Sequence, residues 1–467
     1  MNDMIMKVEV VSRQSIKPSC PTPRHLKTFN LSFLDQLSPS FYVPLILFYE
    51  IDHSNKDDDN NNIIEGTSGH RCEVIKKSLA ETLTRFYPFA GRVKDNRFVD
   101  CNDDGVVCLE ARVNNCRLSQ LIQHPNVQEL EKEFLPFDPY VSETSESSGF
   151  INSDMLLAVQ VNVFEDCGGM VIGVCFSHKI ADACTLLTFI KDWAATARGA
   201  TEQIKGPDFK LSSLFPPRDG LVGFFNQPTL ISREELVTKK FLFGASNIAE
   251  LKKQSIIIPS STSANGGSDD VQEYRPTRVE VVSAFIWRCF MDVDQSKMDR
   301  TAVRVYSVSY SVNMRTRMVP PLPTNCIGNM ETITVALSII NGEGEKSDQY
   351  PNLVGKVRDA IKKIDSDHVR ELQTTDALLN SMKLLQEGMS NEQTVHLHFS
   401  SWCRFPIYES DFGWGKPKCV STCKLALKNL VYLIDTSSGD GIEAWVSLSK
   451  EDMTAFERNE ELLAFVS

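Results

Sequence analysis

The sequence lacks several features that define large classes of proteins. No apolar run reaches about 20 residues, the length that a membrane-spanning helix requires. Residues 1–17 mix charged and β-branched side chains and lack the apolar centre of a signal peptide. No glycine-rich phosphate loop is present, so a doubly wound nucleotide-binding fold is not expected. These absences predict a cytoplasmic protein that has no membrane partner.

Positive charge is also scarce. The chain has 49 Lys and Arg against 61 Asp and Glu, which gives a formal net charge of -12 at pH 7. Because phosphate backbones attract concentrated positive charge, this balance argues against a nucleic-acid partner. The 13 cysteines include no Cys-x-x-Cys pair, and many stand within apolar runs. An odd number of scattered cysteines predicts free thiols in a reducing compartment rather than disulfides or metal ligands.

The length and composition of the chain indicate two domains. The chain has 467 residues, of which 42% are hydrophobic, and this is too long for one ordinary core. We expect a first domain at residues 1–206, a crossover linker at 207–225 and a second domain at 226–467. The linker loses hydrophobic periodicity and is rich in proline and glycine. The polar runs at residues 53–62 and 141–149 are predicted surface loops.

Short apolar segments alternate with amphipathic ones along the chain, which predicts an α/β (α+β) protein with mixed, mostly antiparallel sheets. Two glycine-bearing turns predict hairpins, one formed by residues 97–101 and 106–112 and one by 156–163 and 170–176. Helices are predicted where apolar residues recur at helical spacing, over residues 74–86, 182–197, 277–288, 351–363 and 374–385.

A histidine stands where the second hairpin meets a helix. His178 follows a buried strand and precedes Asp182 by one helical turn, so a rigid scaffold can aim its imidazole into a cleft. Histidine suits a general base because its ordinary pKa is near neutral. The pattern His-x-x-x-Asp alone is weakly specific, since it recurs at His53 and Asp57 in a polar loop. A partly buried structural histidine is the alternative.

A second motif lies far downstream. Ser400-Ser-Trp402 is followed by Asp411-Phe-Gly-Trp-Gly415. Two glycines around Trp414 predict a tight turn rather than a helix. The alternative is a packed loop with a structural aspartate.

Taken together, the two motifs resemble the BAHD acyltransferases, plant enzymes that move an acyl group from a coenzyme A thioester to an alcohol or amine. The resemblance covers essentially the whole chain, because further motifs occur in family order: Leu31–Asp35, Phe86–Arg92, Arg278–Trp287, Asn313–Arg315 and Gly328–Asn329. The motifs are most similar to the branch that contains vinorine synthase and salutaridinol acetyltransferase. Cys326–Met330 differs from the Tyr-Phe-Gly-Asn-Cys stretch of anthocyanin malonyltransferases, which disfavours flavonoid malonylation.

This resemblance implies two chloramphenicol-acetyltransferase-like domains with a solvent channel between them. The first domain would be completed by about residues 408–430, and the chain would be a monomer. His178 would be the general base, and Asp182 would support it structurally by pairing with an arginine. Asp411 would also be structural, with Arg315 as its expected partner. Gly413, Trp414 and Gly415 would shape the channel wall away from the reacting atoms.

The resemblance also suggests residues that contact the substrates. Ser400 and Trp402 are candidate oxyanion donors, and Asn329 is a candidate neighbour of the pantetheine arm. Basic and hydroxyl side chains in the region that family members use for the nucleotide end are candidate coenzyme A contacts, or equally ordinary surface residues: Lys252, Lys253, Thr277, Arg278, Ser283 and Lys416. No permanent cofactor or metal is expected, since His396 and His398 lack further ligand residues nearby.

The sequence therefore predicts transfer of an acetyl group from acetyl-CoA to a hydroxyl group of an alkaloid or terpenoid. Three alternatives remain. A serine-dependent acyltransferase or hydrolase would require Gly-x-Ser-x-Gly, which is absent. The acceptor could instead be an amine, or the chain could be an inactive family member that acts as a binding protein. The sequence does not identify the acceptor or the hydroxyl group.

Overall fold

The structure is a computed structural model. It describes residues 6–50, 63–123, 132–140, 154–165, 169–221, 231–232, 234–256, 275–297, 303–340, 349–389, 391 and 393–467. The loops predicted at residues 53–62 and 141–149 lie outside these ranges. No helix among the described residues is long and apolar enough to cross a membrane.

The chain divides into two compact units. Unit 1 comprises residues 1–231, 322–330 and 405–426, and unit 2 comprises 232–321, 331–404 and 427–467. Two stretches of the second half therefore belong to unit 1. One is close to the segment predicted at about 408–430, and the other, 322–330, has no counterpart in the sequence prediction. Residues 208–215, predicted as part of a linker, pack on unit 1, where Phe33 N donates to Phe215 O and Asp208 N donates to Asn325 O.

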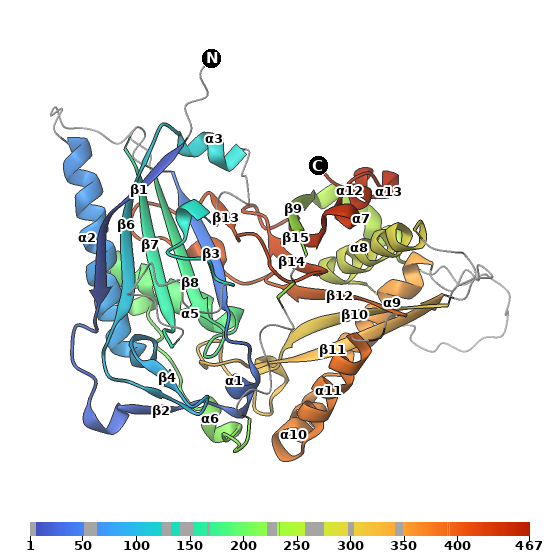
Figure 1. The fold of residues 1–467 in the computed structure, drawn as a ribbon, viewed down its shortest axis with the longest axis horizontal. Coiled ribbons are helices and arrows are strands. Elements are labelled where there is room, and N and C mark those ends of the chain that lie inside the picture. Colours follow the sequence, from blue (N-terminus) through green and yellow to red (C-terminus); the bar gives the residue numbers. More distant parts are fainter. Residues whose placement is uncertain are drawn as a thin grey trace. The chain divides into compact units, whose positions relative to one another are not determined.

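Unit 1 is built on a six-stranded sheet in the order β1-β6-β7-β8-β3-β13 (Figure 1). All its strand pairs are antiparallel except β6 with β7. A second, three-stranded sheet has the order β2-β5-β4. The elements are β1 (Lys7–Ile16), β2 (Thr28–Asn30), α1 (Phe33–Leu37), β3 (Tyr42–Tyr49), α2 (Ile63–Arg85), β4 (Arg92–Lys94), β5 (Phe98–Asp100), β6 (Val106–Asn114), α3 (Leu118–Gln123), β7 (Leu157–Phe164), β8 (Met170–Ser177), α5 (Ala183–Ala197), α6 (Leu211–Leu214) and β13 (Cys419–Ser421).

The predicted hairpin of β7 and β8 is confirmed, and every residue of both strands is buried. The hairpin predicted at residues 97–101 and 106–112 is wrong. β5 pairs with β2 and β4 in the small sheet, whereas β6 pairs with β1 and β7 in the large one. Asp103 and Gly105 adopt positive φ angles of 62° and 89°, so the turn exists but carries the chain from one sheet to the other.

Unit 2 is built on another six-stranded sheet, in the order β11-β10-β12-β14-β15-β9. β12 runs parallel to β10 and β14, and the other pairs are antiparallel. The elements are β9 (Leu236–Phe243), α7 (Ala245–Gln254), α8 (Arg278–Gln295), β10 (Arg304–Asn313), β11 (Glu331–Ile340), α9 (Tyr350–Lys362), α10 (Ser366–Thr374), α11 (Ala377–Met389), β12 (Thr394–Ser401), β14 (Leu430–Asp435), β15 (Ile442–Ser449), α12 (Lys450–Phe456) and α13 (Glu460–Leu463). Both sheets are thus mixed and mostly antiparallel, as the sequence predicts.

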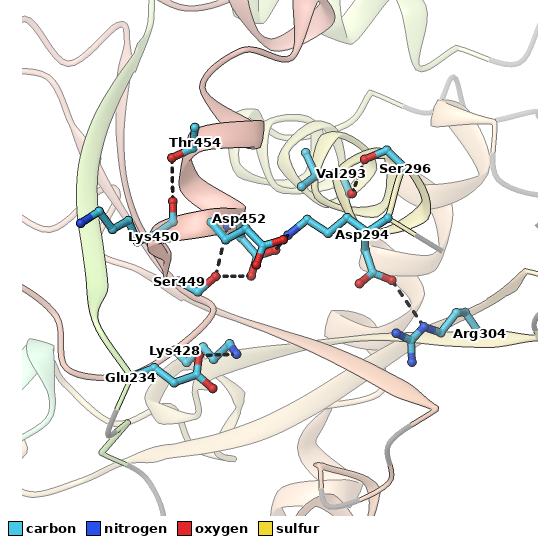
Figure 2. A network of polar contacts seen from close by, with 12 residues as sticks. Glu234, Val293, Asp294, Ser296, Arg304, Lys428, Ser449, Lys450, Asp452 and Thr454 are labelled. Atoms are coloured by element: carbon cyan, nitrogen blue, oxygen red, sulfur yellow. Dashed lines mark hydrogen bonds and ion pairs between the residues drawn. The ribbon is translucent and has the colours of Figure 1, made fainter. Parts of the chain in front are cut away.

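Polar contacts join the helices of unit 2 to its sheet (Figure 2). Ser449 caps α12, because its hydroxyl accepts from Asp452 N at 3.1 Å. The Asp452 carboxylate then pairs with Lys297, which follows α8, at 2.6 Å. Asp294 in the last turn of α8 pairs with Arg304 at the start of β10 at 3.5 Å. These contacts hold the end of α8 against two neighbouring elements.

We predict opposite effects of alanine at two glycines. A Cβ at Gly173 in β8 would collide with the carbonyl oxygen of Phe134, whereas a Cβ at Gly355 in α9 would meet no atom within 4 Å. Gly173→Ala should therefore lower the free energy of unfolding by about 1–3 kcal/mol. Gly355→Ala should raise it by about 0.5–1 kcal/mol, since alanine favours the helix. Urea unfolding of both variants measures this, and equal effects would contradict the packing at β8.

Candidate active site

The end of β8 presents His178. The pairing of β8 with β3 runs to Ser177 opposite Tyr42, and His178 N continues it by donating to Phe41 O at 3.0 Å. The imidazole is half-buried and meets the Phe41 ring edge-on, with ring centroids 5.6 Å apart. Backbone and ring are therefore held by the rigid sheet, as the sequence predicts for a histidine at a strand end.

Asp182 begins the helix that follows. It is the N-cap of α5, and its Oδ1 accepts from Thr185 N at 2.8 Å. Its Oδ2 accepts from Met330 N at 3.0 Å. The buried carboxylate thus ties residues 322–330 to the start of α5. Thr185 reinforces this connection, because its hydroxyl donates to Gly328 O at 3.0 Å.

This connection places the Asn329 side chain beside His178. Asn329 Nδ2 donates to Asp35 Oδ1 at 2.9 Å and to His178 O at 2.7 Å, so the orientation of the amide is determined by two acceptors. Asn329 Oδ1 lies 3.0 Å from His178 Nδ1. Since an amide oxygen only accepts, Nδ1 must carry the hydrogen of the neutral imidazole. Nε2 is left with the lone pair that a base requires.

Asp35 holds Asn329 in this position. The carboxylate is 2% exposed, and its Oδ1 also accepts from Asn329 N at 2.8 Å. Its Oδ2 accepts from the backbone and hydroxyl of Ser32, which form a capping box at the start of α1. Burial raises the pKa of Asp35, while the hydrogen bonds from Ser32 and Asn329 lower it.

The resemblance suggested Asn329 as a neighbour of the pantetheine arm, and Asp35 was not among the predicted site residues. Both side-chain amide hydrogens of Asn329 already have acceptors, so the amide is a partner of His178, and its place beside the pantetheine arm stays a prediction. The Leu31–Asp35 motif was recognised, and its Ser-x-x-Asp spacing indicates a helix cap. Nothing in that spacing shows that the carboxylate also meets a residue almost 300 positions away.

The Asp411–Gly415 loop forms the predicted tight turn. Asp411 Oδ1 accepts from Gly413 N at 2.8 Å and from Gly415 N at 3.0 Å. Both glycines have positive φ angles, 110° and 103°, which a side chain would strain. Phe412 is buried with its ring 5.0 Å from that of Trp193. The loop is therefore an ordered part of unit 1.

The loop and His178 lie at opposite ends of α5. Trp193 and Arg198, which contact the loop, stand at the end of the helix, and Arg198 donates to Asp411 O at 2.5 Å. His178 precedes the start of α5, and a helix of 15 residues is about 22 Å long. The rings of Trp414 and Tyr49 also meet, with centroids 6.5 Å apart. The loop thus supports the unit at a distance from His178.

Three further candidates belong to unit 2. Ser400 is half-buried on β12, two residues after His398. Trp402 is buried, with its ring 5.7 Å from Tyr432, and its backbone N donates to Leu433 O at 2.7 Å. Arg315 is 1% exposed. Its pairing with Asp411 would join residues of different units and stays a prediction, as do the oxyanion roles of Ser400 and Trp402.

The candidate coenzyme A contacts are dispersed. Arg278 pairs with Asp435 at 2.9 Å, and Thr277 caps α8 by accepting from Glu280 N. Ser283 is fully buried in α8, and its assignment as a coenzyme A contact stays a prediction, as do those of Thr277 and Arg278. The other candidates, Lys252, Lys253 and Lys416, stay predictions; Lys253 pairs with Glu250 at 3.3 Å and Lys416 with Glu409 at 2.8 Å. No described group of three His, Cys, Asp or Glu could hold a metal ion.

Comparison with known proteins gives the chain a family context. The model of the Transferase family matches residues 6–463. Stemmadenine O-acetyltransferase of Catharanthus roseus is 40% identical over 97% of this chain and 96% of its own length. Limonoid 1-O-acetyltransferase of Citrus sinensis is 37% identical over 99% of both. Vinorine synthase of Rauvolfia serpentina is 40% identical over 96% of both.

Solved structures agree in fold. The crystal structure of vinorine synthase matches with a TM-score of 0.79 at 37% identity over 99% of both chains. TRI101 of F. graminearum, crystallised with coenzyme A and deoxynivalenol, matches with a TM-score of 0.64 at 16% identity over 94% of this chain and 99% of that one. At that identity the second match shows the fold alone.

We predict that Asn329→Ala shifts the tautomer equilibrium of the neutral His178 imidazole. In histidine labelled with 15N at both ring nitrogens, the native imidazole should show a protonated Nδ1 at pH values where it is neutral. The variant should show a larger Nε2–H population, because the acceptor at Nδ1 is lost. Ser410→Ala, which removes a buried hydrogen bond elsewhere in unit 1, is the control for nonspecific loosening. An unchanged spectrum in Asn329→Ala would show that Oδ1 does not set the tautomer.

The two backbone amides that bind Asp411 predict a graded effect on stability. Asp411→Ala should lower the free energy of unfolding by about 2 kcal/mol, since two hydrogen bonds are lost. Asp411→Asn keeps an oxygen at the acceptor position and should lower it by less than about 1 kcal/mol. Denaturation followed by tryptophan fluorescence tests both. Equal losses would mean that the negative charge, rather than the turn, is what the loop requires.

Proposed function

Because the chain belongs to the Transferase family, the BAHD acyltransferases, which use acyl-CoA as co-substrate, we propose that it transfers an acetyl group from acetyl-CoA to a hydroxyl group of an alkaloid or terpenoid. The relatives named above support acetyl as the acyl group and a hydroxyl as the acceptor. The observation that carries the proposal within the chain is the hydrogen bond from His178 Nδ1 to Asn329 Oδ1, which puts the lone pair of the neutral imidazole on Nε2.

His178 acts as the general base in this proposal. As the acceptor oxygen attacks the thioester carbonyl carbon, Nε2 takes the hydroxyl proton and a C–O bond forms. The tetrahedral intermediate then collapses with cleavage of the C–S bond. The imidazolium returns the proton to the departing thiolate, so the products are the acetyl ester and coenzyme A. General-base assistance of this kind accelerates a reaction about 10²–10⁴-fold.

Asn329 and Asp35 act as positioning residues. The imidazolium formed in the reaction carries its second hydrogen on Nδ1, and Asn329 Oδ1 is placed to accept from it in both protonation states. Asp35 accepts one hydrogen bond from the backbone N of Asn329 and one from its side-chain Nδ2, and so keeps the amide oxygen toward the ring. Asp182 has a separate role, because it holds the backbone of Met330 rather than the imidazole.

The proposal also covers the cellular compartment, the oligomeric state and the contacts with coenzyme A. No disulfide joins the described cysteines, and most of them are buried, which supports a reducing compartment such as the cytoplasm. We further propose a monomer, and Lys252, Lys253 and Lys416 as candidate contacts for the coenzyme A phosphates. Each would be a point charge on a surface loop or helix end.

The test is thiol release from acetyl-CoA with hydroxylated alkaloids and limonoids as acceptors. His178→Ala should reduce kcat by about 10²–10⁴-fold, because the base is lost. Asn329→Ala should reduce kcat by about 10-fold to 100-fold and leave the KM for acetyl-CoA unchanged, because only orientation is lost. Arg370→Ala, which removes an exposed ion pair with Asp367 on α10, is the folded control.

Three results would contradict the proposal. Thiol release that persists in His178→Ala would exclude His178 as the base. Release with amine acceptors but with no alcohol would replace O-acetylation by N-acylation. If no acceptor supports release from acetyl-CoA or longer acyl-CoA donors, the chain would be a binding protein of the same fold.

A further inference from the structure

The residue after His178 is a half-buried lysine that the proposed mechanism does not use. Lys179 stands between β8 and α5, and its Nζ donates to Gln36 O at 3.1 Å. Gln36 is 5% exposed and follows Asp35 in α1. A lysine that is partly removed from water ordinarily has a charged partner. The ammonium is held on the same helix that carries the buried Asp35 carboxylate.

The groups that contact the Asp35 carboxylate are donors. Its Oδ2 accepts from Ser32 N at 2.9 Å and Ser32 Oγ at 2.6 Å, and its Oδ1 accepts from Asn329 N at 2.8 Å and Nδ2 at 2.9 Å. The three N–H groups cannot accept a hydrogen bond, and the Ser32 hydroxyl already accepts from Asp35 N. A carboxylic acid would need an acceptor for its own hydrogen, so this arrangement fits the ionised carboxylate.

The four donors do not fully replace the lost hydration of Asp35. Burial raises the pKa of Asp35, and the hydrogen bonds from Ser32 and Asn329 offset only part of this shift. A positive charge close to the carboxylate would favour the ionised form further.

Lys179 supplies such a positive charge. Burial lowers the pKa of Lys179 to about 8, and the negative charge of Asp35 partly offsets this shift. Because Coulombic attraction is mutual, the same interaction favours the ionised form of Asp35. A second cation, Arg218, lies over the Phe33 ring of α1 at 3.9 Å and keeps its charge at any pH of interest.

The ionisation of Asp35 affects the imidazole through Asn329. The hydrogen bond from Asn329 Nδ2 to Asp35 Oδ1 directs the amide oxygen at His178 Nδ1. A protonated Asp35 would be a weaker acceptor, because hydrogen bonds to an ionised group are the stronger ones. Rotation of the amide would then cost less and would turn its nitrogen to the ring. An amide nitrogen beside Nδ1 would favour the Nε2–H tautomer, which cannot take a proton through Nε2.

We propose that Lys179 is a positioning residue, whose ammonium keeps Asp35 ionised so that Asn329 keeps the lone pair of His178 on Nε2. This inference rests on the proposed acetyl transfer and adds a residue to it. Lys179 acts through the carboxylate and the amide, so it needs no contact with either substrate.

Three variants separate the charge of Lys179 from its hydrogen bond. Lys179→Met removes both, and Lys179→Arg keeps the charge. Asn96→Ala is the matched control, because Asn96 Nδ2 donates to the same Gln36 O at 3.0 Å and carries no charge. Asn96→Ala should lower the melting temperature without changing the ionisation of Asp35. Lys179→Gln, which keeps a neutral donor, replaces Lys179→Met if that variant does not fold.

The first measurement is the ionisation of Asp35 in the full chain. The 13Cγ resonance of labelled aspartate reports it, and the Asp35 signal is assigned by its absence in Asp35→Asn. Lys179→Met should raise the pKa of Asp35, because the neighbouring positive charge is lost. It should also increase the Nε2–H population of His178, measured with 15N at both ring nitrogens. Lys179→Arg should restore both properties.

Three results of these spectra would overturn the inference. One is an Asp35 titration or a His178 tautomer that is the same in Lys179→Met as in the native chain. Another is a failure of Lys179→Arg to restore either property. The third is an Asn96→Ala spectrum that reproduces both changes, since loosening of α1 would then be their cause.

Thiol release is measured in parallel so that the two proposals can fail separately. Lys179→Met should reduce kcat about 10-fold and leave the KM for acetyl-CoA unchanged, and Lys179→Arg should restore kcat. A native kcat in Lys179→Met would overturn the positioning role. No thiol release by the native chain, with both spectral changes present, would disprove the acetyl transfer and leave the coupling of Lys179 to the imidazole standing. Thiol release that falls in Lys179→Met without either spectral change would disprove this coupling and leave the acetyl transfer standing.

Discussion

The buried carboxylate of Asp35 is the constraint on which the arrangement around His178 depends. A carboxylate removed from water must be compensated by hydrogen bonds, and two segments of the chain supply them. Ser32 belongs to α1, Asn329 to the returning segment 322–330, and that segment in turn is fixed to α5 by Asp182. The hydrogen bonds to this one buried carboxylate thus bring together parts of the chain that are remote in sequence. They leave the Asn329 oxygen facing the imidazole.

Asp35 and Asp411 both accept hydrogen bonds from backbone amides, but their environments differ. Asp35 accepts four hydrogen bonds in a buried site, where its pKa is raised by burial and lowered by its donors. Asp411 binds two glycine amides in a turn at the far end of α5. Between them, α5 acts as a rigid connection whose buried face packs on α2, where Trp193 Nε1 donates to Ser78 Oγ at 3.0 Å. Rigidity of this kind is what a precisely aimed base requires.

The two faces of the unit 2 sheet differ in polarity. One face is a conventional core, with Tyr306, Val308 and Tyr310 buried. The other face combines His396 and His398 with exposed Leu337 and Ile339, and the histidine rings form hydrogen bonds with serine hydroxyls of β10. These internal hydrogen bonds matter, because a buried polar group that is left unpaired costs free energy.

The sequence by itself determined the local structure and the family. Hydrophobic spacing and a glycine-bearing turn predicted β7, β8 and α5, and therefore the position of His178 between strand and helix, because these signals act within a few residues. It also predicted the turn at Gly413 and Gly415 from the need for positive φ angles. Only the tertiary structure decided which residues meet His178. The contacts of Asn329 with Asp35 span 294 positions, and the pairing of β5 and β6 with strands of different sheets depends on long-range partners. Local periodicity carries no record of such partners, because they are selected by the packing of the whole unit.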